Sequence, residues 1–389
     1  MDAHPWYRGP RFAALALALA SVVVLHAASA ATPAPAAQPN IVAQARARLA
    51  KLAVPRDAIG KPKSTPKWKR GMKVWVISCD QSLTGCWIPA KSLQTATKQL
   101  GWTVTVFDGH SNPSEWVNGV RQAIAADADV IMLDSVDCSA VRAPLAQAKA
   151  AHIVIYGLNS IDCNDPGAGG GPSLIDYTGV PKGYKSHPQF IRDWGRMKAD
   201  YVIAKTNGRA KVITFSQSDV LGIKYESEAI KQELARCKGC QVVANVSFTL
   251  PDFATGGVFK KFQTALLQHP EANAVVTLYD AIIILAVAPA LQQAGRTKMI
   301  VAGGEGDPSN LELIRRNKLR SCAFAVAVQD AGYPIADNMI RLLAHKRPVD
   351  QATAVLLIDK QHNLKRIHGY YNGFFPYAKY YSKLWRNAK

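Results

Sequence analysis

The stretch Asp129-Val-Ile-Met-Leu-Asp-Ser-Val-Asp-Cys138 gives the clearest indication of the fold class. Its centre, Val130–Leu133, is a short and continuous apolar run with polar residues directly after it. Runs of this kind are typical of strands that are buried on both faces of a parallel sheet. A helical pattern near residues 140–150 follows a polar turn whose side chains can cap a helix. The stretch therefore predicts a strand–helix unit of a parallel α/β sheet.

The same unit is repeated along most of the chain. The first series has further apolar runs at Lys73–Ser78, Thr103–Phe107 and Ile153–Tyr156, with helical stretches near 86–100 and 114–126. A second series begins with a helix near 188–206 and has predicted strands at Lys211–Phe215, Gln241–Val246, Ala274–Thr277, Met299–Ala302, Ser321–Val328 and Ala354–Ile358. The sequence thus predicts an α/β fold with two doubly wound parallel-sheet lobes. Ligands of such sheets bind outside the carboxyl ends of the strands.

The first residues of the chain have the pattern of an export signal. Arg8 and Arg11 precede an apolar run from Phe12 to Leu25, and Ala28-Ser-Ala30 forms a small-x-small cleavage site. The run is shorter than the roughly 20 residues that a spanning helix needs. We expect a signal peptide at 1–30, a mature chain in the periplasm without a membrane span, and a Pro/Ala-rich arm at 31–70 with one short helix.

The chain of 389 residues carries a formal net charge of +19. A strongly basic protein can bind nucleic acid, an anionic membrane surface or acidic ligands. Export argues against nucleic acid, and the Lys and Arg residues are scattered and form no basic stripe. The charge therefore favours a solvated basic surface.

Seven cysteines in an exported chain predict disulfides. Cys237 and Cys240 form a C-x-x-C at the end of a predicted helix, where a structural disulfide is favoured over a redox motif or a zinc site. Cys138 and Cys163 lie just past the ends of two consecutive predicted strands and form a second candidate pair. Cys79 and Cys86 flank a short loop and form a third, which leaves Cys322 as a buried thiol.

The sequence lacks the usual motifs of catalysis. It contains no phosphate loop, no complete dinucleotide fingerprint, no G-x-S-x-G elbow and no H-E-x-x-H. Gly304-Glu-Gly306 follows a predicted strand but lacks the third glycine of the dinucleotide fingerprint. The His residues are dispersed along the chain. We therefore expect no enzyme activity, no cofactor and no metal site.

Polar and aromatic residues instead collect after the predicted strands. A binding site needs flat aromatic faces for the apolar part of a ligand and a few fixed polar groups for its edge. Each residue alone also fits a helix cap or a loop position, and their shared place after strands makes them a candidate set: Asp80, Gln81, Trp87, Asp134, Asp137, Asn159, Gln217, Asp219, Phe253, Tyr279, Asp280, Glu305 and Asp307.

At these residues the chain resembles the type I periplasmic binding proteins of the ribose- and galactose-binding kind, which are exported components of ABC importers. The resemblance covers about residues 72–360. It rests on the order and spacing of several segments: Val74-Trp-Val-Ile-Ser with Cys86-Trp87, Phe107-Asp-Gly-His-Ser-Asn-Pro, the stretch quoted first, Pro251-Asp-Phe253, His269-Pro-Glu-Ala-Asn-Ala-Val-Val, Ala290-Leu-Gln-Gln-Ala-Gly and Ile300-Val-Ala-Gly-Gly-Glu-Gly-Asp.

The resemblance implies a clamshell of two lobes joined by three crossover segments. One lobe would take residues 71–180 and 327–350, and the other 181–326 and 351–370. We expect the C-terminal aromatic segment, 371–389, to dock as an amphipathic helix.

The resemblance also suggests residue roles. Trp87 and Phe253 would sandwich the ligand, and Asn159, Lys224, Tyr279 and Glu305 would hold its polar groups. Gln81, Asp137 and Asp280 are further polar candidates because of their place after predicted strands. Tyr279, Val326 and Asn159 depart from the sugar-binding pattern, so the ligand would be more apolar or aromatic than a pentose.

The sequence therefore predicts a monomeric solute-binding protein that delivers a small organic molecule to an ABC permease. One alternative is a ligand-sensing module that presents its closed form to a chemoreceptor or a sensor kinase, since the same fold serves both uses. Another is an enzyme on a flavodoxin-like fold, which the missing motifs disfavour.

Overall fold

The structure is a computed structural model that describes residues 39–55, 61–327, 331–351 and 354–388. The predicted signal peptide, 1–30, lies outside the described residues. No described helix has the length and apolar character required to cross a membrane.

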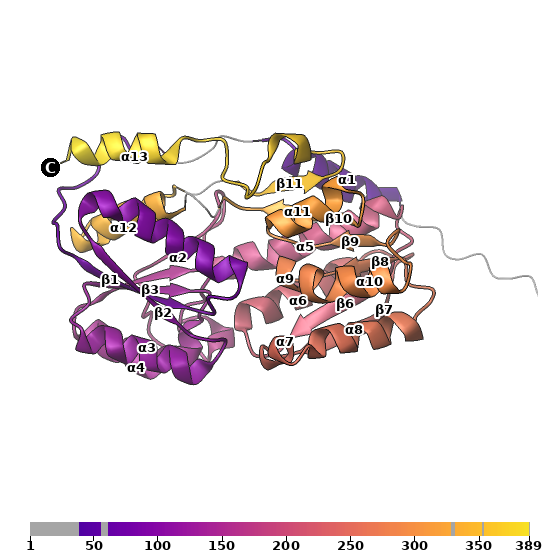
Figure 1. Cartoon of the computed structure of the whole chain (residues 1–389), viewed down its shortest axis with the longest axis horizontal. Coiled ribbons are helices and arrows are strands. Elements are labelled where there is room, and N and C mark those ends of the chain that lie inside the picture. The colour runs from indigo at the N-terminus through magenta and orange to yellow at the C-terminus, as the bar shows by residue number, and fades with distance from the viewer. Residues whose placement is uncertain (1–38, 56–60, 328–330, 352–353, 389) are drawn as a thin grey trace, which may run out of the picture. The chain divides into compact units, whose positions relative to one another are not determined.

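The first half of the chain forms a five-stranded parallel sheet in the order β2-β1-β3-β4-β5. Its strands are β1 (Lys73–Ser78), β2 (Thr103–Asp108), β3 (Val130–Asp134), β4 (Val154–Leu158) and β5 (Tyr177–Gly179). Two pairs of helices cover its two faces (Figure 1): α2 (Thr84–Thr97) with α12 (Gly332–Leu343), and α3 (Pro113–Ala125) with α4 (Cys138–Ala150). Val76 packs toward α2, whereas Ile77 packs toward α3, as the alternation of a strand requires.

The second half forms a six-stranded sheet in the order β11-β10-β9-β8-β6-β7. The strands are β6 (Lys211–Gln217), β7 (Gln241–Phe248), β8 (Ala274–Val276), β9 (Ile300–Ala302), β10 (Arg320–Ala325) and β11 (Leu356–Asp359). The longer helices are α5 (His187–Lys205), α6 (Leu221–Ala235), α8 (Gly257–Gln268) and α11 (Pro308–Arg315). The shorter ones are α7 (Pro251–Ala254), α9 (Asp280–Ile282), a π-helical turn (Ile283–Val287), α10 (Ala288–Gln293) and 3₁₀ turns at Lys98–Leu100, Pro166–Ala168 and Leu364–Arg366.

The two-lobed α/β fold is thus confirmed, with differences at the sheet edges. β5 was not predicted, because three residues are too short to give an apolar pattern. The strand predicted over Ser321–Val328 ends at Ala325, and β11 pairs antiparallel to β10.

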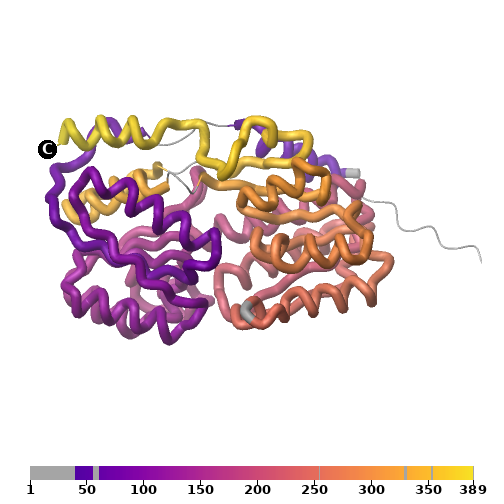
Figure 2. Tube along the Cα trace, viewed as in Figure 1, coloured from indigo at the N-terminus to yellow at the C-terminus, as the bar shows by residue number. Residues whose placement is uncertain are grey.

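Each end of the described chain packs onto a different sheet (Figure 2). α1 (Pro39–Leu52) buries Ile41, Ala45 and Leu49 in the core of the second sheet beside α5. α13 (Tyr377–Arg386) buries Tyr381 and Trp385 in the core of the first sheet. The aromatic C-terminal segment therefore forms a docked amphipathic helix.

Candidate functional site

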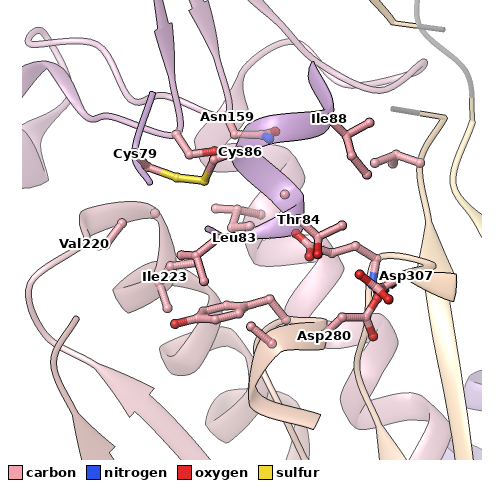
Figure 3. Close-up of a pocket in the computed structure, with 18 of the residues that line it drawn as sticks. Cys79, Leu83, Thr84, Cys86, Ile88, Asn159, Val220, Ile223, Asp280 and Asp307 are labelled. Atoms are coloured by element: carbon pink, nitrogen blue, oxygen red, sulfur yellow. Dashed lines mark hydrogen bonds between the residues drawn. A yellow bond between two sulfur atoms is a disulfide. The ribbon is translucent and has the colours of Figure 1, made fainter. Parts of the chain in front are cut away.

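A pocket of about 160 Å³ lies at the carboxyl ends of strands from both sheets (Figure 3). Cys79, Ser135 and Asn159 follow β1, β3 and β4, and Gln217, Tyr279 and Glu305 follow or end β6, β8 and β9; all six line the pocket. This is the position at which open parallel sheets bind ligands. A volume of this order holds a molecule of about the size of one ring.

The walls of the pocket are mainly apolar. α2 contributes Ile88, the loop before it contributes Leu83, and α6 contributes Ile223. The ring of Trp194, from α5, forms another part of the wall, and the Cys79–Cys86 disulfide lies next to Asn159 in Figure 3. Such walls favour a ligand with an apolar body.

Among the polar side chains of the lining, those of Asn159 and Glu305 have no hydrogen-bond partner among the described residues. Asn159 has a φ of 51°, which Asn tolerates better than most residues. The carboxylate oxygens of Glu305 lie 3.5 and 3.6 Å from the position that a Cβ on Gly85 of α2 would take. These two groups are free to bind a ligand.

Asp280 lines the pocket, but its carboxylate is occupied by the protein itself. Oδ2 accepts hydrogen bonds from the backbone N–H groups of Glu305 at 2.8 Å, Gly306 at 2.9 Å and Asp307 at 2.7 Å. Oδ1 accepts a bond from Nδ2 of Asn310 at 2.7 Å. Asp280 therefore holds the loop that carries Glu305, and its own oxygens are satisfied.

Tyr279 is held in place by its neighbours. Its hydroxyl donates to Oε1 of Gln217 at 2.8 Å, and Nε2 of Gln217 donates to Asp219 at 2.9 Å. Phe253 packs on Tyr279 with 5.9 Å between ring centroids and does not line the pocket. Phe253 thus contacts a pocket residue, Tyr279, without lining the pocket itself.

Burial sets the charge state of the pocket. It raises the pKa of Glu305 to about 8, and the neighbouring Asp280 adds to this effect. The nearby Lys198 is fully buried and ion-paired with Glu226, and its Nζ also donates to the carbonyl of Leu278. The Lys198 ammonium is therefore already neutralised.

Asp137, from the loop after β3, connects the two sheets. Its Oδ1 accepts a hydrogen bond from the backbone N–H of Ile161 at 2.8 Å. Its Oδ2 accepts bonds from the first residues of α6, Leu221 at 3.0 Å and Gly222 at 3.3 Å. Val220, the N-cap residue of α6, makes no side-chain cap bond. Asp137 therefore caps a helix of the other lobe.

The remaining predicted site residues lie outside the pocket lining. Trp87 is 37% exposed and lines a separate surface hollow together with Tyr370, which it contacts at 6.4 Å between ring centroids. The amide of Gln81 donates to Oγ of Ser78 at 2.6 Å, and Lys224 is exposed on α6. Of the candidate residues predicted from the sequence, the structure brings together six in the pocket lining: Asn159, Gln217, Tyr279, Asp280, Glu305 and Asp307.

Several lining residues were not anticipated from the sequence. Besides Trp194, they include His187 at the start of α5 and the adjacent Tyr370 and Tyr371. His187 is 4% exposed, its Nδ1 has no partner among the described residues, and burial lowers its pKa to about 4. Pro188 after it predicts a helix start, but no sequence signal places this helix start beside the pocket.

The cysteines pair as anticipated, with disulfides at Cys79–Cys86, Cys138–Cys163 and Cys237–Cys240. Cys322 is a buried free thiol. Among the described residues one cluster has metal-ligand spacing, Cys138 with Asp162 and Cys163. Its two sulfurs are already bonded to each other, so they are not free thiolates.

Two parallel α/β lobes with a pocket at their strand ends define the class of two-lobed α/β binding proteins. The family profile described as "Periplasmic binding protein domain" matches residues 77–347. The chain therefore belongs to this family of periplasmic binding proteins.

Individual relatives agree with this assignment. The ribose import binding protein RbsB of Salmonella typhimurium is 24% identical over 266 residues, which are 66% of this chain and 81% of the relative. A 5-methylthioribose transporter solute binding protein from Thermotoga lettingae has a TM-score of 0.64 and 14% identity, with coverage of 80% of this chain and 98% of that one. An ABC sugar transporter subunit from Rhodobacter sphaeroides has a TM-score of 0.61 and 18% identity, with coverage of 75% and 99%.

Proposed function

We propose that this chain is the monomeric, exported solute-binding component of an ABC-type importer, and that it binds one small organic molecule in the pocket and delivers it to a permease without chemical conversion. The observation that carries the proposal is the pocket itself. It is lined from the strand ends of both sheets, and its polar side chains include those of Asn159 and Glu305, which make no hydrogen bond to a described residue.

The relatives support transport. Those named above are described as an import protein and as transporter components, so they give no support to the sensing alternative. His187, the one imidazole of the lining, makes no hydrogen bond to a Ser or Cys side chain among the described residues, and a nucleophile–base pair requires one.

The binding residues follow from the pocket geometry. Asn159 and Glu305 would contact the polar edge of the ligand. Leu83, Ile223 and Tyr279 would pack against its apolar body. Five residues that were predicted from the sequence as ligand contacts are left out of the proposal, because none of them lines the pocket: Trp87, Phe253, Gln81, Lys224 and Asp137.

A substitution that fills the pocket tests the proposal. Gly85 is the second residue of α2 and lines the pocket, and a Cβ there makes an ordinary contact of 3.5 Å with Glu305. Gly85→Leu would therefore project a side chain into the ligand space without backbone strain. Thermal-shift screening against sugars, polyols and small aromatic compounds, followed by calorimetry, should find a ligand of the parent chain whose affinity falls by about tenfold or more in this variant.

Gln99→Leu is the matched control, because Gln99 is exposed beyond the end of the same helix. The control should bind as the parent does. Equal affinity of the parent and Gly85→Leu would place the ligand elsewhere and contradict the proposal.

A further inference from the structure

The charge of the pocket contrasts with the charge of the chain. The chain carries a net charge of +19, which favours anionic partners at long range. The pocket lining contains no Lys or Arg among the described residues, whereas it contains three carboxylates, those of Asp280, Glu305 and Asp307.

The other nearby basic groups cannot serve an anion. Lys198 is fully buried, and its ammonium contacts Glu226, the carbonyl of Leu278 and, at 4.2 Å, the ring of Trp194. His187 is neutral at physiological pH because burial lowers its pKa to about 4. A carboxylate or phosphate of a ligand would therefore enter a desolvated site with no cation to meet it, which is costly.

Of the three carboxylates, only Glu305 is unsatisfied. Asp280 accepts four hydrogen bonds, and Asp307 accepts one from the backbone N–H of Ser309 at 2.6 Å as the N-cap of α11. Glu305 makes no side-chain hydrogen bond or salt bridge to a described residue, although the Lys198 ammonium acts on its carboxyl group electrostatically and lowers its pKa. Its oxygens lie beside the first turn of α2, within an otherwise largely apolar pocket.

From this arrangement, and on the basis of the proposed function, we infer that the ligand is an organic cation: an apolar or aromatic body that carries a protonated amine, with the amine paired to Glu305. An ammonium supplies the donors and the positive charge that Glu305 lacks. The aromatic rings of Tyr279, Tyr370 and Tyr371 in the lining are suitable neighbours for a cation.

A matched set of probes tests the ligand class. The full chain is titrated in a calorimeter with 2-phenylethylamine, 2-phenylethanol and phenylacetate, which share a ring and differ in the charged group, and with ribose. The amine should bind roughly tenfold more tightly than the alcohol, and phenylacetate most weakly. In Glu305→Gln the preference of amine over alcohol should disappear. It should persist in Glu228→Gln, because Glu228 is exposed on α6.

A second experiment measures whether Glu305 releases a proton when the amine binds. Because burial raises the pKa of Glu305 to about 8, the carboxyl group holds a proton at neutral pH, and a bound ammonium should expel it. The measured enthalpy of amine binding should then differ between phosphate and Tris buffers, whereas in Glu305→Gln it should not.

The outcomes separate the two claims. Binding of ribose or the alcohol with no preference for the amine, or an amine preference that survives Glu305→Gln, overturns the cation inference and leaves the proposed function standing. Tighter binding of phenylacetate than of the amine also overturns the inference. Absence of binding by any of the four probes counts against the cation inference, whereas Gly85→Leu tests the proposed function independently.

Discussion

At the scale of single residues, Glu305 is the group on which the proposed class of ligand depends most. It was anticipated from the sequence by its place after a strand, and the structure adds that it is the unsatisfied carboxylate of the pocket. Asp137 and Asp280 have the same sequence signal, yet backbone N–H groups occupy their oxygens. Sequence position alone does not distinguish a free carboxylate from a capping one, because the partners come from distant segments.

Glu305 should also make the stability of the ligand-free chain depend on pH. Its pKa in the folded chain is raised from 4.5 to about 8, so the unfolded chain loses this proton first as the pH rises. Stability should therefore fall as the pH rises between about 4.5 and 8. In Glu305→Gln the fall should be smaller, by on the order of 1 kcal/mol, since partial exposure reduces the effect.

Urea unfolding at pH 5 and pH 8.5 measures this difference. Asp280 and Glu226 are present in both proteins, and both interact electrostatically with Glu305. The difference therefore measures Glu305 together with its coupling to these two acids. Parallel pH profiles of the parent and the variant would show that Glu305 is not perturbed in the folded chain.

At the scale of elements, the strands were predictable and the helix orientations were less so. Continuous apolar runs located β1, β3 and β6 within one or two residues. The helix predicted near residue 86 begins at Thr84, and Trp87 lies on the outer surface, so that Leu83 and Ile88 line the pocket in its place. A shift of two residues turns a helical side chain through about 200°, which periodicity cannot resolve.

Substitution of Asp137 tests whether the loop after β3 positions α6. Asp137→Ala would leave the buried backbone N–H groups of Ile161 and Gly222 without this acceptor. We expect a loss of about 1–3 kcal/mol in the free energy of unfolding. Because the bonds to α6 join the two lobes, the radius of gyration by small-angle scattering should also rise. Glu228→Ala, at an exposed site on the same helix, should change neither quantity, and an unchanged radius for Asp137→Ala would argue against a role in holding the lobes together.

The contribution of α13 to the folded core can also be tested by substitution. Trp385 is 2% exposed, stacks on Tyr333 at 6.0 Å between ring centroids, and donates from Nε1 to Asp337 at 3.0 Å. Trp385→Ala should lower the free energy of unfolding by about 3–5 kcal/mol. Lys383→Ala, on the exposed face of the helix, should have little effect in the same thermal or urea titration. A Trp385→Ala chain as stable as the parent would mean that α13 is not part of the folded core.

At the scale of the whole molecule, the two ends of the described chain extend beyond the segment that matches the family, 77–347. The connection between α1 and β1 contacts α13: Trp68 donates to the carbonyl of Trp385 at 3.3 Å, and Tyr380 donates to the carbonyl of Pro62 at 2.8 Å. The sequence indicated a helix in each segment, but not which sheet would receive it. Docking depends on complementary surfaces formed by segments far apart in the chain, and hydrophobic periodicity within one helix carries no information about its partner.

A crystal structure of the chain with the small molecule that gives the largest thermal shift would locate the binding site. We predict that the molecule lies in the pocket at the strand ends, with its polar edge on Asn159 and Glu305 and its apolar body against Leu83, Ile223 and Tyr279. A molecule bound at the surface hollow of Trp87, with the pocket unfilled, would contradict this prediction.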